Sequence, residues 1–230
     1  RIKIKIRTMS GRVGSITTGI VSDGLALHLD AANRASYPKT GTTWFDTISA
    51  NNGTIENGAV FDADVGGNFD FDGSNDYVET NYNLPASTTK FSTSLWIRPH
   101  NTSTAQVLID NRDAATDGYN VFISSNTIRF RINGTDLISN SISGRVNTWF
   151  NVTTTYNGNL KRIFFNGVID NGTSQTATLN VSNLTRIGTI SQSSPSANFN
   201  GQIASAQIYE RALSKPEVLH NYNALKDRFQ

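Results

Sequence analysis

Three oxygen-bearing side chains fall within five positions of the chain, at Asp72, Asn75 and Asp76, beside Gly73. Carboxylate and amide oxygens are the ligands that Ca²⁺ prefers, and a tight turn would bring them together. The same residue types form Asx turns, in which an aspartate accepts hydrogen bonds from nearby backbone N–H groups. The residues leave both interpretations open, and Ca²⁺ is the one cofactor that they suggest.

Catalytic chemistry has weaker support. Glycoside hydrolysis uses two carboxylates about 5 to 10 Å apart. No second acid stands two or four positions from any glutamate, at Glu56, Glu79, Glu210 or Glu217. Asp70 and Asp72 alternate with Phe69 and Phe71, so a strand would turn the rings inward and the carboxylates toward solvent. Because the three histidines are scattered, the sequence predicts no catalytic residue.

Sugar recognition would use exposed aromatic rings surrounded by polar groups. The three tryptophans, Trp44, Trp96 and Trp149, fall in strand patterns typical of a core. Three tyrosines near turns are the candidates for an exposed glycan platform: Tyr37, Tyr82 and Tyr119.

The charge is unevenly placed. Five cations and no acid occupy the first twelve residues, and the rest of the chain carries a net charge of −3: Arg1, Lys3, Lys5, Arg7 and Arg12. Residues 1–7 alternate cations with isoleucines, as in a strand with one apolar face. Such an arm either guards a sheet edge or adds to a neighbouring subunit through its apolar face and cations. Nucleic-acid binding has little support, since no second basic stretch or interleaved aromatic accompanies the arm.

The elements that must position these residues are short strands. Aromatic and aliphatic residues recur two apart at residues 25–30, 69–78, 91–99, 106–110 and 201–209, bounded by turn residues. Asn157-Gly158-Asn159 joins residues 149–156 to 160–165 as a hairpin. Ser214 and Glu217 match a helix capping box, followed by an apolar stripe at helical spacing, Val218, Tyr222, Leu225 and Phe229.

One domain is expected, with a basic arm over residues 1–22 and a body over residues 23–230, because no linker divides the body. The chain has no cysteine, so no disulfide framework is available. No apolar run approaches the ~20 residues of a membrane span.

Several motifs in order resemble the laminin-G-like branch of the concanavalin A-like lectin/glucanase jelly rolls. They cover nearly all the body: Phe71-Asp72-Gly73-x-Asn75-Asp76-Tyr77-Val78, Phe91-x4-Trp96-Ile97-x-Pro99, Trp149-x-Asn151-Val152, Phe165-Asn166-Gly167 and Ile208-Tyr209-Glu210-Arg211-Ala212-Leu213-Ser214. The resemblance implies an all-β fold, a two-sheet antiparallel jelly-roll sandwich of six or seven strands per sheet, with a short C-terminal helix and an extended N-terminal arm. The family often adds acids to the Asp72 turn where this chain has Ala204 and Ser205, which weakens the Ca²⁺ hypothesis.

The opening residues 23–38 and the closing residues 221–229 resemble a narrower subset, common in virion proteins of tailed phages and other viruses. This resemblance implies a non-catalytic virion structural protein: a phage head-decoration protein, a minor capsid protein or a fibre domain. Its partners would be other capsid proteins reached through the arm, or further copies of itself. The alternative is a carbohydrate-binding adhesin module on an extracellular or bacterial surface. A polysaccharide hydrolase ranks third.

Overall fold

The computed structural model describes residues 19–113, 117–179, 181, 183–191 and 196–230. The arm cations lie outside the described residues, so their role in docking a partner remains a prediction. Within the described part of the chain, no helix is long and apolar enough to cross a membrane.

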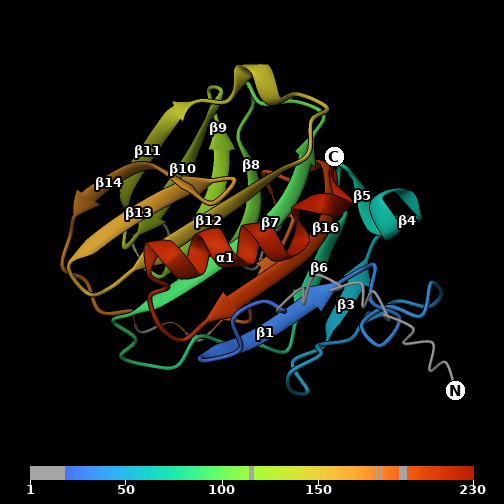
Figure 1. The fold of residues 1–230 in the computed structure, drawn as a ribbon, viewed down its shortest axis with the longest axis horizontal. Coiled ribbons are helices and arrows are strands. Elements are labelled where there is room, and N and C mark those ends of the chain that lie inside the picture. The colour runs from blue at the N-terminus through green and yellow to red at the C-terminus, as the bar shows by residue number, and fades with distance from the viewer. Residues whose placement is uncertain (1–18, 114–116, 180, 182, 192–195) are drawn as a thin grey trace, which may run out of the picture.

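Two antiparallel sheets of eight strands each form a sandwich (Figure 1). The front sheet has the order β14 (Val168–Ser174), β13 (Leu160–Phe165), β12 (Phe150–Tyr156), β7 (Phe91–Pro99), β16 (Asn200–Tyr209), β5 (Asn68–Asp72) and β4 (Val60–Asp62), and β1 (Leu25–Asp30) also pairs with β16. The back sheet has the order β11 (Thr135–Ser141), β10 (Thr127–Ile132), β9 (Tyr119–Ser124), β8 (Gln106–Asn111), β15 (Arg186–Ile187), β6 (Tyr77–Thr80), β3 (Gly53–Glu56) and β2 (Thr43–Trp44). The all-β jelly-roll prediction is confirmed, with more strands per sheet than the six or seven expected.

Alternation explains the core between the sheets. Phe91 on β7 packs against two rings of the other sheet. Its ring centroid lies 4.6 Å from that of Tyr119 on β9 and 5.8 Å from that of Phe130 on β10. These rings come from opposite sheets and are fully buried. Offset and edge-on aromatic pairs of this kind stabilise a core beyond their buried area. The inward orientation that alternation predicts for residues 91–99 is confirmed at Phe91, which is fully buried.

The C-terminal helix α1 (Lys215–Leu225) lies across the outer surface of the front sheet (Figure 1). The Glu217 carboxylate accepts hydrogen bonds from the Ser214 backbone N–H at 2.8 Å and from its hydroxyl at 2.7 Å, as the capping-box pattern predicts. Val218 is buried against the sheet. Beyond the helix, Phe229 stacks on Trp96 at 3.9 Å between centroids.

Three short 3₁₀ turns complete the regular structure, at Asp64–Gly66, Ser143–Arg145 and Lys226–Arg228. The last of them follows α1 and ties the C-terminal segment to β1. Arg228 donates through Nη1 to the two carboxylate oxygens of Asp30, at 2.9 and 3.1 Å. The helix is thus fastened to the sandwich at both of its ends.

Candidate functional site

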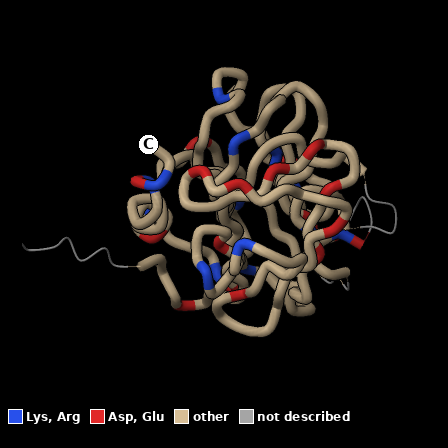
Figure 2. The backbone as a smooth tube through the Cα atoms, turned by 90° about the vertical axis from the view of Figure 1, so that its right-hand side faces the viewer, with Lys and Arg blue, Asp and Glu red and all other residues tan. Residues whose placement is uncertain are grey.

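A groove of about 780 Å³ opens at the β4 edge of the front sheet. Its walls come from β4, β5, the start of β16, the residue after β7 and the turns at residues 57–58 and 72–76. The lining residues are Asn57, Gly58, Val60, Phe61, Asp62, Ala63, Asp70, Phe71, Asp72, Asp76, His100 and Asn200. Figure 2 views the molecule from this side and shows acidic positions spread across it.

Strand register sets the order of the side chains in the groove. Asp70 lies opposite Val60 of β4 and opposite Gln202 of β16. Asp72, two residues further along, lies opposite Asn200. Because successive side chains of a strand point to opposite faces, the two aspartates share the outer face while Phe69 and Phe71 fill the core. The orientation predicted from the alternation is confirmed.

His100, the residue after β7, lies beside these side chains. Its backbone N–H donates to the Asn200 carbonyl at 2.9 Å, which places the imidazole beside β16. The ring Nδ1 lies 3.1 Å from Asn200 Oδ1 and 3.9 Å from Asp70 Oδ1. The site therefore presents an imidazole, an amide and a carboxylate within reach of one ligand.

Two of the groove carboxylates have raised pKa values. Burial raises the pKa of Asp70, and the neighbouring Asp62 charge raises it further, while His100 and Arg98 act in the opposite direction. Burial also raises the pKa of Asp76, with the charges of Asp72 and Asp70 adding to it. Within the described part of the chain, no lysine or arginine forms an ion pair with either carboxylate.

An apolar ledge borders the acidic wall. Val60 is 64% exposed. Phe61 is half-buried, and its ring lies 5.1 Å from the Tyr37 ring, centroid to centroid. Carboxylate and amide groups beside an aromatic–aliphatic surface can bind the hydroxyl and C–H faces of a sugar.

The residues proposed for Ca²⁺ form an Asx-type turn. Asp76 Oδ2 accepts the Asp72 N–H at 3.0 Å, and Asp72 Oδ1 accepts the Ser74 N–H at 2.7 Å. In the described part of the chain, no three His, Asp or Glu side chains gather closely enough to hold a metal ion. The geometry thus matches the second of the two interpretations, and the Ca²⁺ site at Asp72, Asn75 and Asp76 stays a prediction without geometric support.

The exposure expected for the three tyrosines is wrong. Tyr37, Tyr82 and Tyr119 are 5%, 3% and 0% exposed. Tyr37 donates its hydroxyl to the Gly41 carbonyl at 2.9 Å, and Tyr82 donates to Glu210 Oε1 at 3.2 Å. Burial raises the pKa of both the Tyr82 and the Tyr119 hydroxyls. Rings that pack into the core cannot offer a face to a sugar.

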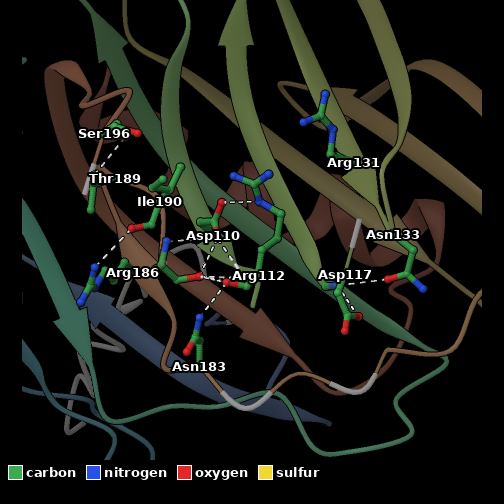
Figure 3. A network of polar contacts seen from close by, with 12 residues as sticks. Asp110, Arg112, Asp117, Arg131, Asn133, Asn183, Arg186, Thr189, Ile190 and Ser196 are labelled. Atoms are coloured by element: carbon green, nitrogen blue, oxygen red, sulfur yellow. Dashed lines mark hydrogen bonds and ion pairs between the residues drawn. The ribbon is translucent and has the colours of Figure 1, made fainter. Parts of the chain in front are cut away.

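A second polar cluster lies at the end of β8 (Figure 3). Asp110 accepts from Arg112 Nε at 2.7 Å and from the Ser191 hydroxyl at 2.6 Å. Asn183 donates from its side chain to the Arg112 carbonyl at 2.8 Å. Asp110 is 0% exposed and Arg112 is 7% exposed. This network is buried and closed on itself, so its role is to fasten loops rather than to bind a ligand.

Sequence reasoning missed Asp62, His100 and Asn200 as members of one site. They stand far apart in the chain and meet only because β4, β5, β16 and β7 are neighbours. One signal was available, since Asn200 and Gln202 alternate in the same way as Asp70 and Asp72. Two polar-faced strands that pair would place all four side chains on one surface.

The comparisons with known proteins identify the family. A family model described as the concanavalin A-like lectin/glucanases superfamily matches residues 72–219. The chain belongs to this superfamily. The search of curated proteins found no match.

Several solved structures share the fold, and the titles of two of the following three name binding domains. The binding domain of botulinum neurotoxin DC in complex with SialylT matches with a TM-score of 0.68 and 21% identity, covering 88% of this chain and 51% of that one. A structure titled "Cell entry of botulinum neurotoxin type C is dependent upon interaction with two ganglioside molecules" matches at 0.69 and 19%, covering 88% and 51%. The binding domain of Paraclostridial Mosquitocidal Protein 1 matches at 0.69 and 17%, covering 87% and 52%. The chain spans about half the length of these structures.

Proposed function

We propose that this chain is a non-catalytic carbohydrate-binding module of a secreted or cell-surface protein, and that saccharides bind in the β4-edge groove. The observation that carries the proposal is the groove itself, in which carboxylates, amides and an imidazole stand beside the apolar ledge of Val60 and Phe61. Few polar groups at fixed positions beside an apolar wall are typical of small-ligand sites.

The comparisons support the carbohydrate-binding alternative rather than the virion role. Of the three neighbours named above, two are titled as binding domains, and the titles of two mention SialylT or gangliosides. Since the chain spans half of each neighbour, their ligand sites need not lie in the shared half. The groove of this chain must therefore be tested directly.

The test is a glycan array followed by titration calorimetry with the saccharides that bind. Asn200→Ala removes a polar group of the groove, and we expect it to weaken binding about tenfold, as loss of a central contact does. Asn159→Ala is the matched control, because Asn159 is exposed in the β12–β13 hairpin, away from β4. Absence of saturable binding, or equal affinity of Asn200→Ala and wild type, would refute the proposal.

Hydrolysis is measured on the same saccharides. Asp70 and Asp72 are two positions apart on one face of β5, so they are the pair of acids that a glycosidase mechanism would use here. If new reducing ends are released and this activity is lost in Asp70→Asn, the proposal of a non-catalytic module is wrong and the protein is a glycoside hydrolase.

A further inference from the structure

Four aspartates and one histidine line the groove, and no lysine or arginine is among its lining residues. Arginines do hold several carboxylates elsewhere in the fold, among them the pairs Asp30–Arg228, Glu79–Arg186, Asp110–Arg112, Asp136–Arg131 and Glu217–Arg211. Among the described residues, Asp62, Asp70, Asp72 and Asp76 make no ion pair with lysine or arginine. In the described part of the chain, the one basic side chain within 4 Å of these carboxylates is the His100 imidazole, whose Nδ1 lies 3.9 Å from Asp70 Oδ1.

Arg98, whose charge lowers the pKa of Asp70, is held by neutral groups. Arg98 lies on β7 and affects Asp70 only through the electrostatic field. Its Nη1 donates to Gln202 Oε1 at 3.0 Å, and its Nε donates to the Asn147 carbonyl at 3.0 Å. Because its guanidinium donates to Gln202 and Asn147, Arg98 makes no hydrogen bond to the groove aspartates, which can then bind a cationic ligand.

The second oxygen of the Asp76 carboxylate lies at the groove wall. Asp76 is one of the lining residues, and its Oδ2 accepts the Asp72 N–H at 3.0 Å. Its Oδ1 lies beside Gly58, where a Cβ would be in ordinary van der Waals contact with it at 3.8 Å. A hydrogen-bond donor of a ligand in the groove can therefore approach this oxygen.

We infer that the groove selects saccharides that carry a protonated amine, and disfavours anionic saccharides. This inference rests on the proposed function and specifies the ligand class of the same site. A sugar ammonium donates three hydrogen bonds and carries the positive charge that the four aspartates lack, while the hydroxyls and the ring face bind the amides and the apolar ledge. A carboxylated sugar would meet like charge at short range.

The test compares oligosaccharides of one length that differ only in charge. The probes are glucosamine pentamer, its N-acetylated form and cellopentaose, titrated in mildly acidic buffer at low and high salt, with sialyllactose as the anionic probe. We expect the glucosamine pentamer to bind about tenfold more tightly than the N-acetylated pentamer, a preference that weakens with salt. Sialyllactose should not bind in this range.

The variants separate charge from shape. Asp70→Asn keeps an acceptor oxygen and removes the charge, so we expect it to weaken the glucosamine pentamer about fivefold to tenfold and to leave the N-acetylated pentamer within twofold. Asp170→Asn, on β14 at the opposite edge of the front sheet, is the control and should change neither. The decisive quantity is the difference between the two affinity changes that Asp70→Asn causes, for the charged and for the N-acetylated pentamer. A merely structural role of Asp70 would change both affinities equally.

The outcomes distinguish the two proposals. Equal affinity for the three pentamers overturns the charge selectivity and leaves carbohydrate binding in place. Absence of binding to every saccharide overturns both. Spermidine is the last probe: if it binds as tightly as the glucosamine pentamer, the groove recognises amines without the sugar, and the inference fails.

Discussion

Lys161 of β13 should make the fold less stable at neutral pH than a methionine would. The side chain is 0% exposed, and its Nζ donates to the Thr135 carbonyl at 2.8 Å. Burial lowers the pKa of Lys161 from 10.5 to about 8, with the Asp136 charge opposing the change. The folded protein therefore tolerates the ammonium less well than the unfolded chain does.

The magnitude follows from that difference. At about 1.36 kcal/mol per pKa unit, the buried charge costs about 3 kcal/mol at pH 7. We halve this figure to about 1.5 kcal/mol, because an effective dielectric well above that of a dry interior applies even to buried sites. Lys161→Met also loses the hydrogen bond to Thr135, which lowers the free energy of unfolding by about 1 kcal/mol. The variant should gain about 0.5 kcal/mol in free energy of unfolding at pH 7.

The pH dependence is the sharper readout. Between pH 8 and 10.5 the folded state releases the Lys161 proton before the unfolded state does, so wild-type stability rises with pH in this window. Lys161→Met lacks this rise, and the variant should lose its advantage by about pH 10. Urea unfolding from pH 7 to 10 measures both curves, with exposed Lys90→Met as the control. A variant that is less stable than wild type by a constant amount across this range would refute the reasoning.

Two further predictions concern acids with opposite roles. Asp110→Asn should destabilise the fold by about 3 kcal/mol, because Arg112 would remain buried without its counter-ion; Asp110→Asn with Arg112→Met should cost less in urea unfolding, and a single variant within 0.5 kcal/mol of wild type would contradict this. Asp70→Asn should raise the free energy of unfolding at pH 7 by a few tenths of a kcal/mol. Its folded pKa lies above the ordinary 3.8, so wild type loses stability as pH rises through that window, and unfolding at pH 3 should show no gain. Equal stability of the two proteins at both pH values would contradict it.

The sequence could predict the elements better than their partners. Residues 25–30 and 91–99 form strands with the bounds expected, because burial of one face or both imposes a continuous apolar pattern. The sequence pattern carries no clear signal for β14, since it is an exposed edge strand with little apolar alternation. Turn chemistry correctly placed the hairpin at Asn157. It misled for Tyr119, because a residue close to a turn in the chain can still point between two sheets.

The candidate site was out of reach for a different physical reason. Asp70 and Gln202 face each other across β5 and β16, yet 132 positions separate them in the chain. Strand pairing at this distance depends on the global order of the sheet, which local periodicity does not encode. What the sequence does encode is the outward polar face of each strand. The groove arises where two such faces meet at an edge.

The buried acids outside the groove are compensated by partners within the chain. Asp110 is held by an arginine and Asp46 by hydrogen-bond donors, the His28 N–H and the Ser49 hydroxyl among them, because an unpaired buried charge is costly. The groove keeps Asp70 and Asp76 close to like charges, although an amide in either place would relieve the repulsion. Perturbed carboxylates gathered in a cleft are typical of binding or catalytic sites, where a ligand supplies the missing charge. The repulsion between these carboxylates lowers the stability of the fold, and this cost indicates that the residues serve binding rather than folding.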